Sequence, residues 1–64
     1  MSVGLTPKLN EWINEETPVI ARTIAEDKFT GTVNWFDNYN ISLETENGEV
    51  VLFKGTLAYL KPIE

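Results

Sequence analysis

The stretch from Lys28 to Trp35 alternates between two kinds of side chain, and this pattern constrains the fold more than any other feature. Every second residue shares one face of an extended chain, so the mainly apolar face carries Phe29, Gly31, Val33 and Trp35. A period of two is typical of a β-strand with one buried face. The glycine in mid-strand, Gly31, predicts a sharp bend or the close approach of another backbone segment.

The rest of the chain predicts one helix and four further strands in a single domain, residues 1–64. The helix is expected at about residues 7–15, because apolar residues recur there at helical spacing, and Trp12 is expected to anchor it on the sheet. The strands fall within about residues 18–62, and the dipeptide Asn47-Gly48 marks a hairpin. Together these elements predict a mostly β fold with a small, strongly bent antiparallel sheet or barrel.

The chain contains neither cysteine nor histidine, which narrows both its chemistry and its means of stabilisation. Disulfides and thiolate metal sites are excluded, and zinc binding or histidine-based catalysis is not expected. No nucleophile–base pair, metal cluster or glycine-rich phosphate loop is visible, so we expect no enzyme, no metal and no cofactor. A core of this size contributes only ~3–5 kcal/mol, which leaves self-assembly as the stabilising device.

Two strands near the C-terminus are candidates for that assembly. The segments "VVLFK" (50–54) and "LAYLK" (57–61) are apolar and carry little charge inside, as expected of strand edges that pair with another chain. The alternative is that they pair with each other and with the first strand, "PVIARTIA" (18–25). The residues alone give both interpretations equal weight.

The formal net charge of −5 argues against loose, sequence-independent binding to nucleic acid, which requires cationic surface. It leaves room for a local cationic site. No apolar run approaches the ~18 residues of a membrane span, and the first residues do not resemble a signal peptide. We therefore expect no membrane contact and a cytoplasmic location, with which the lack of cysteine agrees.

Two motifs give the sequence a resemblance to a known family. The segment "DKFTGTVNWFDNYNISL" (27–43) resembles the first motif of the Sm/Lsm superfamily, with its Gly in the strand and Phe-Asp at the bend. The segment "FKGTLAYLKP" (53–62) resembles the second motif of the bacterial Hfq branch, where Lys follows an aromatic residue. The resemblance covers about residues 5–62 and is greatest to Hfq of the cyanobacterial type.

The resemblance implies an Sm-like fold: an N-terminal α-helix followed by a strongly bent, five-stranded antiparallel sheet forming an SH3-like open barrel. It also implies a homo-oligomeric ring, expected to have six subunits, with five or seven left open. In such a ring the fourth and fifth strands join neighbouring subunits, and the implied contact residues are Val51, Phe53, Tyr59 and Leu60. The function implied is RNA binding that helps small RNAs pair with messages.

The resemblance also places a uridine site on one face of the ring, the proximal face, where Asn38, Tyr39 and Lys54 match the pattern. Tyr39 can stack a base, Asn38 can donate to and accept from a base edge, and Lys54 can meet a phosphate or a base carbonyl. The alternative is that Tyr39 packs at a subunit contact, Asn38 is a turn residue and Lys54 is a solvated charge. Asp37 is expected to be structural, satisfying backbone groups at the bend.

Several positions depart from the family pattern. Gly55 replaces the usual His after Lys, and the helix end (14–16) is acidic where many relatives have Arg. The first hairpin turns at residues 26–27, Glu-Asp, instead of at a Gly. On the opposite, distal face Arg22 replaces an aromatic residue while Lys28 is kept, so only weak RNA binding is expected there.

Two functions therefore compete at this point. The first is an RNA-binding ring that uses the proximal residues. The second is an acidic ring with little RNA affinity that serves as a scaffold for a protein partner with a basic surface. A positive field at the pore would favour the first function, and a negative field throughout would favour the second.

Overall fold

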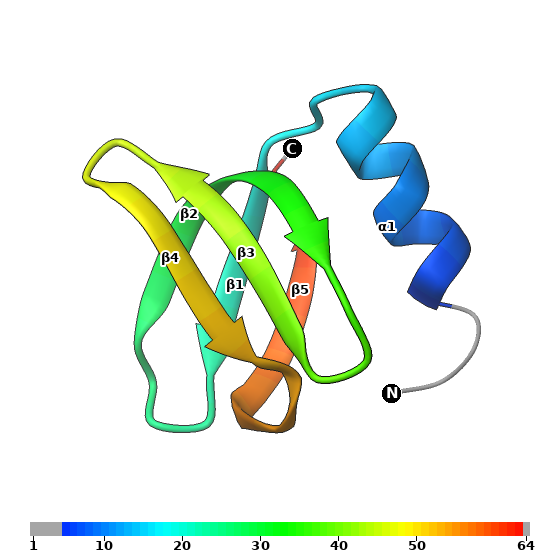
Figure 1. Cartoon of the computed structure of the whole chain (residues 1–64). Helices are drawn as coiled ribbons and strands as arrows, with labels where there is room; N and C mark the ends of the chain where they lie inside the picture. The colour runs from blue at the N-terminus through cyan, green and yellow to red at the C-terminus, as the bar shows by residue number, and fades with distance from the viewer. Residues whose placement is uncertain (1–4, 64) are drawn as a thin grey trace.

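The computed structural model describes residues 5–63 as a helix followed by a strongly curved five-stranded sheet (Figure 1). The elements are α1 (Leu5–Asn14), β1 (Val19–Thr23), β2 (Lys28–Phe36), β3 (Asn40–Thr45), β4 (Gly48–Phe53), a 3₁₀ turn (Lys54–Thr56) and β5 (Leu57–Pro62). The mostly β fold expected from the sequence is confirmed. The helix begins two residues earlier and ends one residue earlier than expected.

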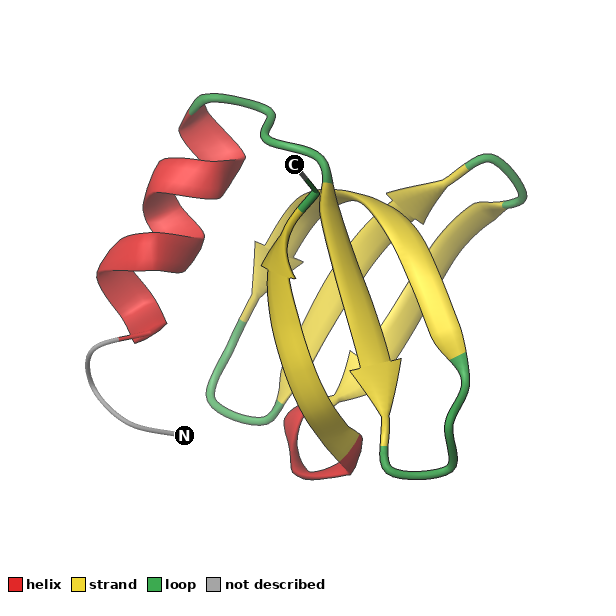
Figure 2. Ribbon diagram, turned by 180° about the vertical axis from the view of Figure 1, so that it is seen from behind, coloured by secondary structure: helices red, strands yellow, loops and turns green. Residues whose placement is uncertain are grey.

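The strand order is β4-β3-β2-β1-β5, and every neighbouring pair is antiparallel. The long strand β2 serves both halves of this sheet: its first half pairs with β1 as far as Gly31, and its second half pairs with β3 from Thr32. The curvature of β2 between these halves folds the sheet toward a barrel, as Figure 2 shows from behind. The bend predicted at Gly31 is thus where β2 changes partner.

The alternation in β2 ends at a β-bulge. Val33 pairs with Leu43, but the register shifts before Trp35, which pairs with Ser42. A bulge moves the following side chains to the opposite face. The interpretation that Trp35 shares the inner face with Val33 is therefore wrong: Trp35 is 41% exposed, while Phe36 packs against the core.

The core lies inside the curved sheet and under the helix. Leu9 and Trp12 of α1 are buried against β-strand residues, so the prediction that Trp12 anchors the helix is confirmed. The buried strand residues of this cluster are Val19, Ala21, Val33, Ile41, Leu43 and Leu52. At ~0.8 kcal/mol per buried methylene, this single cluster is the main source of the domain's own stability.

The helix ends in a Schellman motif that has glutamate where glycine is usual. The amide of Thr17 donates to the carbonyl of Trp12 over 3.0 Å, and the amide of Glu16 donates to that of Ile13 over 3.2 Å. Glu16 has a φ of 51°, in the left-handed region that disfavours side chains. Glu26 at the β1–β2 turn, with a φ of 71°, likewise occupies a position that suits glycine.

The two C-terminal strands form the two ends of the sheet: β4 pairs only with β3, and β5 pairs only with β1, within residues 5–63. The alternative in which the two strands pair with each other is therefore wrong, although β5 does pair with the first strand. Each leaves one row of backbone donors and acceptors without a strand partner. The same part of the chain has no helix that is long and apolar enough to cross a membrane.

Candidate functional site

The turn between β2 and β3 is held together by one carboxylate. Oδ1 of Asp37 accepts hydrogen bonds from the amides of Tyr39, at 2.8 Å, and Asn40, at 2.7 Å. The Asp37 amide in turn donates to the Asn40 carbonyl at 2.9 Å. These amide donors, first that of Tyr39 and then that of Asn40, lower the pKa of Asp37 from its usual value of 3.8. The structural role expected for Asp37 is confirmed.

The other half of the site comes from the end of β4. Asn40 pairs with Phe53 in the β3–β4 ladder, and the amide of Lys54 donates to the carbonyl of Tyr39 over 2.7 Å. The turn that follows β4 is closed by Thr56, whose hydroxyl donates to the Phe53 carbonyl. Backbone hydrogen bonds therefore fix the backbone of Tyr39 relative to that of Lys54, although fourteen residues lie between them along the chain.

Where these two segments meet, the surface forms an open hollow of about 470 Å³. Six residues line it: Asn38, Tyr39, Phe53, Lys54, Gly55 and Leu57. All three residues proposed for a uridine site are among them, so the fold brings together side chains that the sequence keeps apart. Tyr39 is 67% exposed, which leaves its ring free to contact a ligand.

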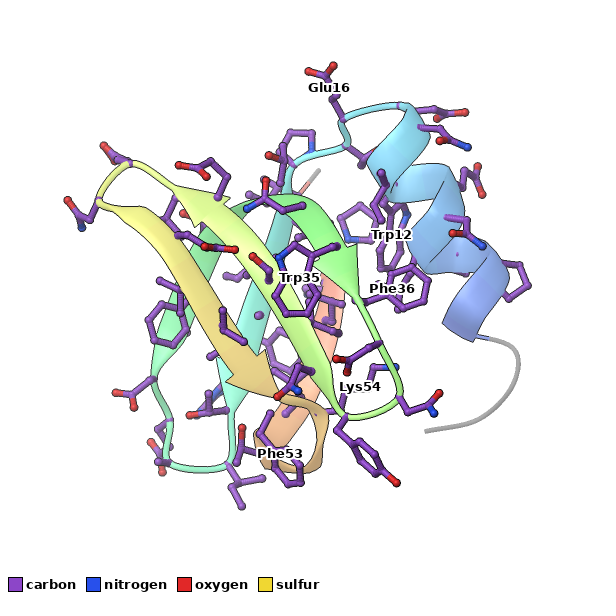
Figure 3. The ribbon with its side chains drawn as sticks, viewed as in Figure 1. Trp12, Glu16, Trp35, Phe36, Phe53 and Lys54 are labelled. Carbon is purple, nitrogen blue, oxygen red and sulfur yellow. The ribbon has the colours of Figure 1, made fainter. Side chains whose placement is uncertain are left out.

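The cation of the hollow is oriented by an aromatic ring. Nζ of Lys54 lies 5.4 Å from the centroid of the Phe36 ring. In Figure 3 the Lys54 side chain lies next to Phe36, and the Phe53 ring lies beyond the end of β4. A cation–π contact at this distance contributes about 0.5–1 kcal/mol at an exposed site, enough to bias the ammonium position without neutralising its charge.

Sequence reasoning missed the part of Phe53 in this hollow. From the sequence, Phe53 was expected only at a subunit contact, and Gly55 was interpreted as the loss of the hydrogen-bond donor that His supplies in the family pattern. In the structure the ring of Phe53, which is 54% exposed, lies over Gly55. No residue pattern signals this arrangement, because it depends on the space that Gly55 leaves for the Phe53 ring.

The residues proposed for weak binding on the distal face also lie together. Arg22 and Lys28 are cross-strand partners on β1 and β2, and Tyr59 faces Arg22 from β5. The guanidinium of Arg22 lies 3.5 Å from the carboxylate of Glu26. This exposed ion pair contributes little to stability, but it places a negative charge beside one of the two cations.

The four residues proposed for the subunit contact fall on the two edge strands. Val51 and Phe53 on β4 are each about half exposed, and Tyr59 on β5 is 36% exposed. Leu60 is different, because it is half-buried and packs against the core of its own chain. Val51 is therefore the residue whose replacement would test an edge contact with least damage to the fold.

Residues 5–63 contain no group of acidic side chains that could hold a metal ion. A family model described as "Hfq related" matches residues 6–62, nearly the whole sequence. This chain belongs to the Hfq-related family. The family inferred from the two sequence motifs is confirmed.

Two solved structures show how closely the Hfq fold is kept. An Hfq protein from Anabaena sp. is 26% identical, with a TM-score of 0.87 over 97% of this chain and all of that one. A second structure, of a pleiotropic translational regulator named Hfq, is 16% identical, with a TM-score of 0.84 over 89% of this chain and 95% of that one. The second likeness concerns the fold alone. No curated protein matches the sequence.

Proposed function

We propose that the chain is a subunit of a ring that binds single-stranded, uridine-rich RNA and acts in post-transcriptional regulation in the cytoplasm. The observation that carries this proposal is the hollow shared by Asn38, Tyr39 and Lys54. Membership of the Hfq-related family, whose proteins form homo-oligomeric RNA-binding rings, supports it.

The chemistry of the hollow suits an unstacked base. A Tyr ring stacks on a base with a gain of about 1–3 kcal/mol, and it does so without reading the sequence. The amide of Asn38 supplies both donors and an acceptor, which a uracil edge requires. Lys54 adds a positive charge for a phosphate or a base carbonyl. One protomer thus offers a stacking surface, a hydrogen-bonding group and a charge in one place.

A ring would multiply this weak site. The unpaired edges of β4 and β5 lie at opposite ends of the sheet, so a contact between them is heterologous and can close into a ring. We propose six subunits, with five or seven as the other outcomes that native mass spectrometry would distinguish. A strand of RNA that touches several hollows in turn would gain affinity through effective concentration.

The net charge favours a second candidate function. At −5 per chain, a six-membered ring would carry about −30, and the helix end contributes the exposed Glu15 and Glu16 to its surface. Such a surface attracts basic protein partners and repels RNA except where cations are grouped. In this alternative the ring is a scaffold for protein binding, and the hollow has little affinity for RNA.

One titration separates the two functions. Short oligo-uridine is titrated against wild type, Tyr39→Ala and Lys54→Ala at two salt concentrations, with Lys61→Ala as the control for loss of a cation elsewhere. For RNA binding at the hollow, Tyr39→Ala should cost about 1–3 kcal/mol per bound base at both salt concentrations. Lys54→Ala should reduce the slope of log K against log salt by about one, since one fewer phosphate is neutralised.

The outcomes are distinct. Equal binding by wild type, Tyr39→Ala and Lys54→Ala would mean that RNA binds elsewhere on the ring. If wild type does not bind oligo-uridine even at low salt, the scaffold function replaces the RNA function. A basic peptide titrated against the same proteins then provides the positive test of the scaffold.

A further inference from the structure

The ring of Phe53 occupies the space that a side chain at position 55 would need. A Cβ built on Gly55 would lie 2.6 Å from Cε2 of Phe53 and 3.1 Å from its Cδ2. Contacts under 3.0 Å are not found for real Cβ atoms, so the ring can lie here only because residue 55 is glycine. The glycine that removes a donor from the family pattern therefore admits an aromatic ring.

This ring borders the same hollow as Tyr39. Phe53 is 54% exposed and Tyr39 is 67% exposed, and both line the hollow. Their backbones are held by the last pairs of the β3–β4 ladder, where Phe53 pairs with Asn40. The hollow thus has two exposed aromatic rings, carried by segments that backbone hydrogen bonds hold together.

We infer that Phe53, which the family resemblance assigned to the subunit contact, is instead a second base-stacking residue of the RNA site, placed in the hollow by Gly55. The inference rests on the proposed RNA function and adds a residue to that site. It shifts the site toward stacking, because Gly55 has no hydrogen-bonding side chain to offer beside the Phe53 ring. The ligand it fits is an unstructured RNA segment whose bases are already unstacked, since two rings reward exposed base faces.

Two variants test the inference, one by displacing the Phe53 ring and one by removing it, and a third variant is the control that restores the ring. Gly55→Ala keeps Phe53 but forces its ring away. The displaced atoms are the far end of a flexible side chain, so the fold tolerates the change. Phe53→Leu keeps an apolar side chain but removes the ring. Phe53→Tyr keeps the ring and is the conservative rescue. The wild type and the three variants are titrated with oligo-uridine at two salt concentrations, and native mass spectrometry records the subunit number of each.

We expect Gly55→Ala and Phe53→Leu to weaken oligo-uridine binding about 5- to 150-fold per base stacked, with Phe53→Tyr near wild type. The loss should be the same at both salt concentrations, because a stacking ring releases no counterions. Subunit numbers should not change.

Three results would overturn the inference. If Tyr39→Ala weakens binding while Gly55→Ala and Phe53→Leu bind like wild type, the RNA site stands without Phe53. If either variant changes the subunit number, Phe53 acts at the subunit contact and not on the base. If wild type itself binds no oligo-uridine, the proposed RNA function fails, and the role of Phe53 fails with it.

Discussion

Gly31 of β2 lies against the backbone of Glu44 on β3, so closely that a Cβ at position 31 would be 1.9 Å from the Glu44 carbonyl oxygen. No rotation of a side chain can relieve this contact, because both partners are backbone. We therefore expect Gly31→Ala to destabilise the domain by about 1–3 kcal/mol or more through overpacking. Urea denaturation followed by circular dichroism measures the loss. Thr30→Ala, exposed on the same strand, is the control and should change stability by less than about 0.5 kcal/mol.

Replacing Glu16 by glycine should stabilise the protein. Glu16 has a φ of 51° at the end of the Schellman motif and points into solvent in Figure 3. Glycine removes a left-handed strain of about 1–2 kcal/mol and a negative charge that opposes the helix dipole. The control is Glu15→Gly, which removes the same charge from a residue with negative φ. A gain in the denaturation midpoint shared equally by both variants would show that charge and not backbone geometry is responsible.

Acid should weaken the turn that carries Tyr39. The pKa of Asp37 is lowered in the folded protein, so its stabilisation is fully present above the unfolded value of 3.8. It is lost as the pH falls through the lower folded pKa, when the carboxylate is protonated. We expect Asp37→Asn to flatten the dependence of stability on pH below about 4, measured by thermal melts across that range.

The comparison for that measurement is Asp27→Asn. Asp27 lies in the β1–β2 turn, and its carboxylate accepts no hydrogen bond from the residues that the structure describes. A pH dependence altered as strongly by Asp27→Asn as by Asp37→Asn would show that net charge, and not the two amide bonds to Asp37, governs acid stability.

Lysine at position 51 should prevent assembly without unfolding the subunit. Val51 is half exposed on the edge strand β4, where a lysine opposes pairing with another chain. We expect Val51→Lys to sediment as a smaller species than wild type at micromolar concentration, with unchanged circular dichroism. Glu46→Lys, at the tip of the β3–β4 hairpin, is the control for added positive charge. Wild type that sediments as a folded monomer would rule out the ring.

The distal face should bind oligo-adenosine weakly, because the guanidinium of Arg22 lies beside the carboxylate of Glu26 and position 22 offers no aromatic ring to stack on a base. Arg22→Tyr would place a ring opposite Tyr59, its partner on β5. Fluorescence anisotropy with oligo-adenosine should then show tighter binding than wild type. Strong wild-type binding that survives the loss of both Arg22 and Lys28 would contradict this prediction.

Much of this fold can be predicted from local patterns, and the misses have physical causes. Alternation predicted β2, and the glycine at 31 predicted a close backbone approach, which Glu44 provides. Alternation failed at Trp35, because a bulge depends on the pairing with β3 and leaves no trace in the residue order. Once the bulge turns it outward, the Trp35 indole donates to the carboxylate of Glu49 over 3.1 Å.

The candidate site, like the fold, could be predicted from the sequence only in part. The motif that resembles Hfq singled out Asn38, Tyr39 and Lys54, and the ladder between β3 and β4 brings them to one hollow. The position of Phe53 could not be predicted in this way. It depends on the empty space above Gly55, and an absent side chain shows its effect only in three dimensions.

The bend of β2 has a consequence for the size of an assembly. Its two halves lead outward through neighbouring strands to the two edges of the sheet, β5 on one side and β4 on the other. In a ring closed through those edges, each subunit is rotated relative to the next by an amount that depends on the angle between the β4 and β5 edges. That rotation would set how many subunits complete a full turn. Gly31 and the bulge beside Val33 would then determine the subunit number from inside the protomer, and evolution could change the ring without altering a single contact residue.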